Sequence, residues 1–144
     1  MKGEIAKGYF LQGLNCCQAV VMAFKDELGL SEEEIKKFSI GFGGGLARQR
    51  LTCGAVSGMT MVLGALKTDG KDKAQAYALI KSACDEFKAE TGSIICAEML
   101  SGEILKDKST VPENRTPEYY KKRPCADLCY LAAEIAEKYI KRIG

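Results

Sequence analysis

Apolar residues recur at helical intervals along almost the whole chain, and no segment shows the strict alternation of a half-buried strand. In the last part of the chain, for example, Leu128, Ala132, Ile135 and Tyr139 fall three or four residues apart and form one apolar stripe. The spacing therefore predicts an all-α fold. A chain of 144 residues has the length of one domain, so we expect residues 1–144 to form a single-domain helical bundle.

Local signals set the expected ends of the helices. Asn15 followed by Gln18, and Ser31 followed by Glu34, have the spacing of capping boxes at helix starts. Thr52 is the expected cap of a later helix. The bundle should contain about six to seven helices, and a helical turn at Tyr119–Tyr120 is also expected. We expect the helices at residues 3–12, 16–28, 32–40, 53–67, 72–90, 94–100 and 125–143.

The chain contains seven cysteines and no histidine. Without an imidazole there can be no Cys–His nucleophile pair, no mixed Cys/His zinc site and no histidine-ligated haem. No nucleophile–base pair for hydrolysis is recognisable either. The cysteines must therefore act with one another, with a metal, or as buried apolar residues. They are Cys16, Cys17, Cys53, Cys84, Cys96, Cys125 and Cys129.

Four cysteines, Cys16, Cys53, Cys96 and Cys125, fall in the first turn of an expected helix. Free backbone N–H groups and the helix dipole favour a thiolate there, so we expect a lowered pKa and a capacity to bind metal or attack a disulfide. The helices that begin near Cys16, Cys53 and Cys96 are the second, fourth and sixth of the chain. In an up-and-down bundle alternate helices begin at the same end, so these three cysteines could lie together there. The long proline-containing connection before the last helix could return Cys125 to that same end.

The other three cysteines have a simpler interpretation. Cysteine packs as a small apolar residue, and Cys84, Cys17 and Cys129 are expected to do so. Cys125 and Cys129 lie one helical turn apart, and could still share a ligand site. The chain has no Cys-x-x-Cys motif, so spacing alone is a weak indication of metal.

The net charge and the hydropathy of the chain limit the kinds of binding partner and the cellular compartment that we expect. A net charge of +2 gives no indication of binding to nucleic acid or an anionic membrane. Arg48 and Arg50, which follow a glycine-rich run, could bind an acidic partner, but solvated loop arginines are the simpler expectation. The first residues lack the apolar core of a signal peptide, and no stretch is long enough to span a membrane. We therefore expect a cytoplasmic protein that binds neither nucleic acid nor a membrane.

The glycine-rich run 41–45 followed by Cys53-Gly54-Ala55-Val56-Ser57-Gly58 resembles the C_GCAxxG_C_C family of redox-active proteins. The resemblance extends to Asn15-Cys16, to Gly92-Ser93-Ile94-Ile95-Cys96 and to the start of the last helix at Cys125. It identifies the same four cysteines as the family's defining ones. Related domains resemble the N-terminal part of split-Soret cytochromes, in which four such cysteines hold an iron–sulfur cluster. The resemblance thus implies a cluster on Cys16, Cys53, Cys96 and Cys125.

Three functions remain open from the sequence. The first is electron transfer or redox sensing by an iron–sulfur cluster, with a two-iron cluster favoured over a four-iron cluster; such a cluster can be lost from protein prepared in air. The second is a metal-free thiol–disulfide redox protein. The third is a non-enzymatic helical domain in which four cysteines bind a zinc ion.

Overall fold

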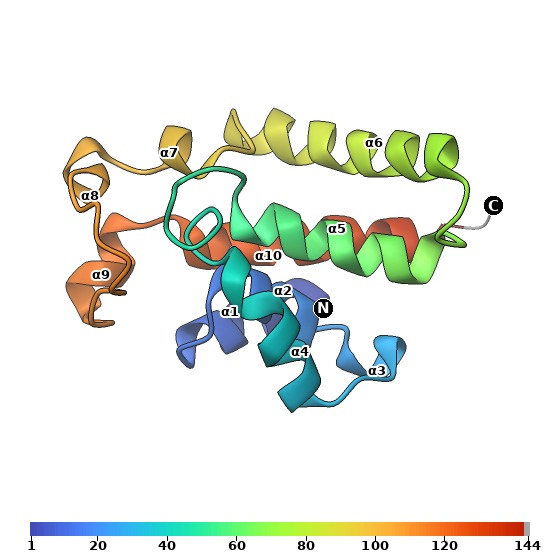
Figure 1. The fold of residues 1–144 in the computed structure, drawn as a ribbon, viewed down its shortest axis with the longest axis horizontal. Coiled ribbons are helices and arrows are strands. Elements are labelled where there is room, and N and C mark those ends of the chain that lie inside the picture. The colour runs from blue at the N-terminus through green and yellow to red at the C-terminus, as the bar shows by residue number, and fades with distance from the viewer. Residues whose placement is uncertain (143–144) are drawn as a thin grey trace.

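The computed structural model describes residues 1–142, and within that range it contains ten α-helices and no β-strand (Figure 1). The all-α fold predicted from the sequence is confirmed. The expected count of six to seven helices is slightly low, because the connections contain helices of only four to six residues. The elements are α1 (Lys2–Leu11), α2 (Cys16–Met22), α3 (Lys25–Leu28), α4 (Glu32–Ser39), the 3-10 turn η1 (Ile40–Phe42), α5 (Gly54–Lys67), α6 (Lys73–Thr91), α7 (Cys96–Met99), α8 (Gly102–Leu105), α9 (Pro117–Lys122) and α10 (Cys125–Lys141).

Most helix ends lie where the sequence places them. Both predicted capping boxes are present, at the starts of α2 and α4. The expected helix 16–28 is divided, because Phe24 leaves the helical conformation between α2 and α3 and its side chain is buried. Thr52 is not the cap of α5: its backbone pairs with Ile95, so Cys53 takes that position. The expected end of the last helix, Ile143, lies outside the described residues.

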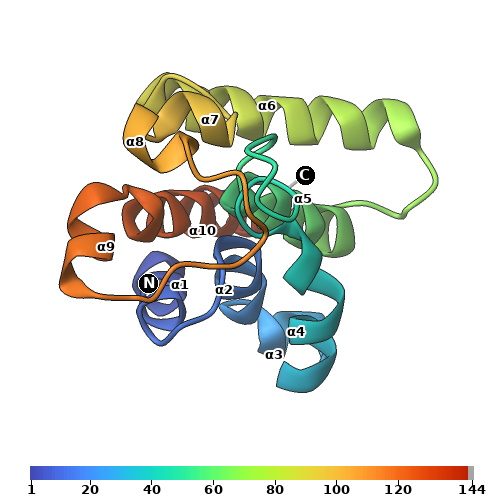
Figure 2. The ribbon, with the colours of Figure 1, turned by 60° about the vertical axis from the view of Figure 1, so that its left-hand side comes forward.

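The long helices form three layers. α5 and α10 lie side by side in the middle, α6 covers one side of them, and α1 and α2 cover the other (Figure 1). α5 and α10 both begin at the end of the molecule that carries α7, α8 and α9. The connection from α8 to α9 passes across this end (Figure 2). The chain therefore does not need to cross the bundle before α10, because α6 has already returned it to that end.

Two glycines on α5 set the distance between α5 and α2. A Cβ atom added to Gly54 would lie 2.9 Å from the carbonyl oxygen of Phe42 and 3.2 Å from Cβ of Cys16. One added to Gly58 would lie 3.0 Å from Cβ of Val20 and 3.1 Å from the carbonyl oxygen of Cys17. Contacts this short are tighter than a Cβ atom normally makes, so a side chain at either position would require its neighbours to shift. The close approach brings the start of α2 against the start of α5.

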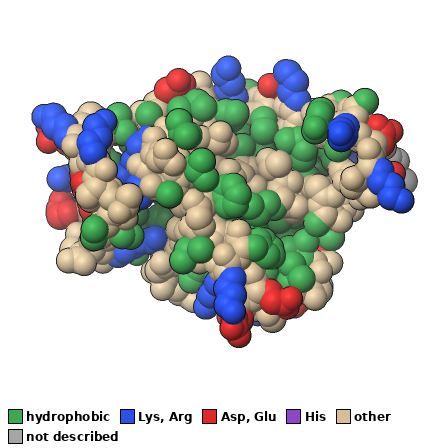
Figure 3. Space-filling model, in the orientation of Figure 1, with side chains coloured by type: hydrophobic (Ala, Val, Ile, Leu, Met, Phe, Trp, Pro, Cys, Tyr) green, Lys and Arg blue, Asp and Glu red, His purple; other side chains and the backbone are tan. Residues whose placement is uncertain are grey.

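The outer surface is of mixed composition. On the face drawn in Figure 3, charged side chains gather mainly at the periphery, and the centre carries apolar and uncharged groups. No helix within residues 1–142 has the length and apolar content needed to cross a membrane.

Adding a methyl group to Gly58 should destabilise the fold. We expect Gly58→Ala to lower the free energy of unfolding by about 1–3 kcal/mol, because the methyl group overpacks the α2–α5 contact. Gly64→Ala, on the same helix, is the matched control: a Cβ there meets nothing within 4 Å, so this change should stabilise by about 0.5–1 kcal/mol. Urea unfolding followed by circular dichroism measures both; equal effects of the two changes would contradict the close-packing explanation.

Candidate functional site

The capping box at the start of α2 positions Cys16. The side chain of Asn15 accepts a hydrogen bond from the backbone N–H of Gln18 at 2.9 Å, and the side-chain oxygen of Gln18 accepts one from the backbone N–H of Asn15 at 3.0 Å. The Asn15 amide also donates to the carbonyl oxygen of Ile40 at 2.9 Å, and the Gln18 amide donates to that of Lys36 at 3.1 Å. These bonds fix the first turn of α2 against the end of α4 and the 3-10 turn that follows it.

Backbone pairing between two distant segments brings Cys53 next to Cys96. The N–H of Cys53 donates to the carbonyl oxygen of Ile94 at 2.8 Å, and the N–H of Cys96 donates to that of Leu51 at 2.6 Å. These bonds surround an isolated antiparallel bridge between Thr52 and Ile95. The starts of α5 and α7 are therefore held together, although they are far apart in the sequence.

The loop before α5 has an unusual left-handed conformation. Gly44 and Gly45 have positive φ angles, and so do four residues that are not glycine: Leu46, Ala47, Arg48 and Arg50. Side chains disfavour this region, so the segment stores conformational strain, a feature that concentrates at functional sites. Gly45 has a second role, because a Cβ atom there would lie 2.8 Å from Cβ of Cys96. The loop thus packs directly against one of the four candidate cysteines.

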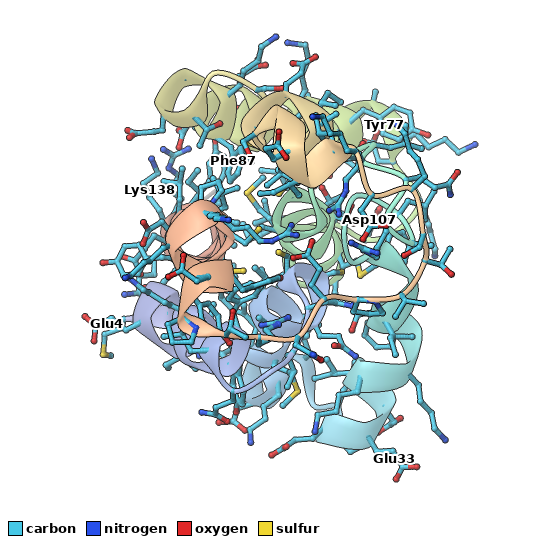
Figure 4. The ribbon with its side chains drawn as sticks, turned by 90° about the vertical axis from the view of Figure 1, so that its left-hand side faces the viewer. Glu4, Glu33, Tyr77, Phe87, Asp107 and Lys138 are labelled. Carbon is cyan, nitrogen blue, oxygen red and sulfur yellow. The ribbon has the colours of Figure 1, made fainter. Side chains whose placement is uncertain are left out.

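All four cysteines singled out by the sequence line one cavity, of about 60 Å³, which we call the cysteine cavity. Cys16, Cys53 and Cys96 are buried, and Cys125, which follows Pro124 at the start of α10, is half-buried. Viewed from this end, sulfur atoms lie at the centre of the molecule among α2, α5 and α10 (Figure 4). The wall of the cavity also includes the side chains of Phe10, Asn15, Arg50, Met99, Leu100, Arg115, Tyr119, Arg123 and Leu128.

The three remaining cysteines do not line the cysteine cavity. Cys17 is fully buried, with its sulfur 3.9 Å from that of Met61, and Cys84 is half-buried on α6. Cys129 is fully buried too, and its thiol lies 3.8 Å from the carbonyl oxygen of Cys16. Cys17 and Cys129 therefore pack in the core, as their positions in the sequence predict, and Cys129 supports the turn that carries Cys16.

The arginines of the site are not predicted correctly from the sequence. Arg48 and Arg50 are expected to be solvated, but the Arg48 side chain is only 11% exposed and two guanidinium nitrogens of Arg50 are buried. Arg115 and Arg123, which also line the cavity, carry no sequence signal beyond their proximity to prolines. Arg50 donates from Nη1 to the sulfur of Cys96 at 3.9 Å, whereas its Nε and Nη2 have no hydrogen-bond partner within residues 1–142.

The pKa values of the four thiols are raised, and not lowered as their helix positions predict. Burial raises the pKa of Cys53 to about 12, and the backbone N–H groups of Val56 and Ala55 lower it by less. Burial also raises the pKa of Cys96 against the smaller opposing effect of Arg50. The helix-terminal effect is therefore present, but desolvation is larger because these thiols lie inside the protein.

The thiols of Cys16 and Cys125 influence each other directly. Interaction with the thiol of Cys16, together with burial, raises the pKa of Cys125. The pKa of Cys16 is also raised: its interaction with Cys125 favours the thiolate, but Cys129 and burial outweigh that contribution. The two thiols lie close together in the protein interior, where burial disfavours even one thiolate.

No group of three or more cysteine or carboxylate side chains within residues 1–142 is arranged to hold a single metal ion. All seven cysteines are free thiols.

Comparison with known proteins identifies the family. A family model described as "Putative redox-active protein (C_GCAxxG_C_C)" matches residues 14–139, which is most of the chain. The chain belongs to the C_GCAxxG_C_C family. No curated protein and no solved structure matches it significantly. The matched range contains all four cysteines of the cavity and the left-handed loop beside it, so the cysteine cavity is the candidate site of this C_GCAxxG_C_C protein.

Burial of the cysteine cavity predicts slow alkylation of its thiols. At pH 8 a thiol with a pKa of about 12 has about one thousandth of the thiolate population of an ordinary cysteine with a pKa of 9.0. In reduced, metal-free protein we expect iodoacetamide to label Cys84 first and Cys53 far more slowly, with labelling of Cys53 accelerating as the pH rises towards 12. Peptide mapping by mass spectrometry measures both rates, and equal rates at pH 8 would contradict this account.

Proposed function

We propose that this protein is a redox protein in which Cys16, Cys53, Cys96 and Cys125 hold an iron–sulfur cluster for electron transfer or redox sensing. One observation carries the proposal: four cysteines from four separate helix starts line a single cavity, and three of them are buried. Buried thiols pack well as isolated apolar residues, so packing alone gives no reason for four of them to face the same space. The family's description as redox-active supports the same interpretation.

The residues of the cavity fit such a group chemically. Iron–sulfur clusters are bound by four cysteine thiolates and need no histidine. Four thiolates satisfy either a two-iron or a four-iron cluster, and we propose the two-iron form. When bound, a cluster supplies one-electron transfer at a potential set by its charge, its burial and the hydrogen bonds to its sulfurs.

Neighbouring groups of this chain have defined roles in the proposal. The backbone N–H groups of Ala55 and Val56 lie at the thiol of Cys53 and can donate to its sulfur. The Arg50 guanidinium beside Cys96 supplies positive charge, which offsets the charge of ligating thiolates. Phe10 and Leu128 contribute an apolar part of the wall, which lowers the local polarity around the sulfurs. Together these groups favour sulfur in its anionic form in a place where free thiols stay protonated.

A metal-free thiol–disulfide function is the second candidate, and the direct interaction of Cys16 with Cys125 favours it. Oxidation of these two thiols would form one S–S bond and release two protons and two electrons to an oxidant. A disulfide in this position would close part of the cysteine cavity. Thiol trapping followed by mass spectrometry, after mild oxidation, tests whether this pair forms.

We further propose that the protein acts in the cytoplasm and exchanges electrons with another redox protein. An odd number of cysteines, all free, suits a reducing compartment, where structural disulfides are rare.

Anaerobic purification tests the proposed cluster. We expect the wild-type protein to be brown, to contain iron and acid-labile sulfide, and to absorb in the visible range. Cys53→Ala should lose most of this absorption, because Cys53 is one of four required ligands. Cys84→Ala is the matched control, since Cys84 lies outside the cysteine cavity, and it should keep the spectrum of the wild type.

Two results would reject the cluster. A colourless protein after anaerobic reconstitution with iron and sulfide would do so, as would a visible spectrum unaffected by Cys53→Ala. Stoichiometric zinc without redox activity would instead identify a structural zinc site with four cysteine ligands.

A further inference from the structure

A second cavity, of about 250 Å³, opens beside the cysteine cavity, and we call it the arginine cavity. A hollow with positively charged side chains at its edge is visible on the left of Figure 3, between the α9 end and the centre of the molecule. The two cavities share part of their walls. The shared residues are Asn15, Gly44, Arg50, Arg115, Tyr119 and Arg123.

Arginine is concentrated in this cavity to a degree that composition does not explain. The chain has five arginines and sixteen lysines. Four of the arginines, Arg48, Arg50, Arg115 and Arg123, line the arginine cavity, and none of the lysines does. The lining includes a single carboxylate, that of Glu113. Because arginine keeps its charge at any accessible pH, the cavity carries a lasting excess of positive charge.

Contacts on the outer side hold three of these guanidinium groups in place. Arg48 donates to the carbonyl oxygen of Ser109 at 2.8 Å and pairs with Asp107, which lies on the connection after α8 (Figure 4). Arg115 donates to the carbonyl oxygens of Phe10 and Leu14 at 2.6 and 2.8 Å.

Arg123 pairs with Glu113 and lies over the ring of Tyr119, 4.5 Å from its centroid. Arg115 packs against the same ring from 5.3 Å. These three arginines are therefore fixed in position without a ligand, so a ligand would meet them already oriented.

Arg50 differs, because one edge of its guanidinium has no partner. Nη1 is turned to Cys96, while Nε and Nη2 are buried without a hydrogen bond. Nε–H and Nη2–H lie along the same edge of the planar group, and this edge binds two oxygens of a carboxylate, phosphate or sulfate side by side. Burying two donors of a charged group without an acceptor is costly. The edge is therefore available to an acceptor that enters beside Arg50 and draws it toward the cavity.

We propose that the arginine cavity is a binding site for a small oxyanion, and that the guanidinium of Arg50 turns its unpartnered edge toward the bound anion as a bidentate anchor. The volume admits a molecule of the size of phosphate, sulfate or a short dicarboxylate. The ligand would lie beside the cysteine cavity, separated from it by Arg50. This site goes beyond the redox function proposed above and requires no cluster, because every group in it belongs to the chain.

Isothermal titration calorimetry of the metal-free protein of 144 residues in a zwitterionic buffer tests the site. Phosphate, sulfate and succinate are the three probes, and chloride at equal ionic strength is the control. We expect saturable one-to-one binding of at least one probe and none of chloride. Preference for phosphate and sulfate would identify a tetrahedral inorganic ligand, and preference for succinate would identify a carboxylate ligand.

Two variants with opposite expected effects make the test specific. Arg50→Gln removes the bidentate edge and should raise the Kd by about tenfold or more. Glu113→Gln removes the only carboxylate that lines the cavity, and should lower the Kd several-fold. Loss of folding would weaken binding in both, so opposite changes exclude that explanation. Arg142→Gln is the matched control: Arg142 is half exposed, lies outside the cavity, and should leave the Kd unchanged.

Absence of saturable binding by the wild type, or an Arg50→Gln protein that binds like the wild type, would overturn the proposal. If Arg50→Gln does not fold, Arg50→Lys keeps the charge but not the two-donor edge, and should also bind more weakly. The visible spectrum reports the cluster independently, so failure of one proposal is distinguishable from failure of the other.

Discussion

The site depends on the backbone pairing between the segment before α5 and the segment before α7. Two short hydrogen bonds and the Thr52–Ile95 bridge bring Cys53 and Cys96 together across more than forty residues of chain. The pairing requires extended backbone at Thr52, which is why α5 begins at Gly54. It also anchors the C-terminal end of the left-handed loop, because the carbonyl oxygen of Arg50 accepts from the N–H of Ala97 at 3.1 Å. One small piece of antiparallel structure in a helical protein thus positions two cysteines and an arginine.

Burial determines the chemical state of the thiols. A cysteine at an exposed helix start loses its proton readily, because free N–H groups and the helix dipole stabilise the thiolate. Here the same N–H groups act on Cys53, yet its pKa rises because the thiol lies in the protein interior. The four cysteines are therefore unreactive as isolated thiols. They become good donors only where a positive charge, either a bound metal or a guanidinium, compensates for the missing water.

The sequence predicts the local features of this protein well and its long-range ones poorly. The capping boxes at Asn15 and Ser31 are recognisable because all their partners lie within three residues. The helical spacing of apolar residues likewise predicts which face of a helix is buried, and the spacing of glycines predicts where another helix can approach closely. The break at Phe24 and the exact start of α5 arise from tertiary packing and from pairing with a remote segment, which no local pattern encodes. Helix position and family resemblance identify the four cysteines, whereas their common cavity is visible only in the fold.

The arginines show why overall charge is a poor guide to a local site. A net charge of +2 correctly describes the average of a surface on which lysine and glutamate alternate. The fold then gathers four of five arginines, from the left-handed loop and from the connection before α10, around one cavity. Lysine could supply the same charge, but only arginine offers a planar edge with two parallel donors and a face that stacks on Tyr119. The use of arginine in place of lysine, more than the amount of positive charge, therefore supports the proposal that this cavity binds an oxyanion.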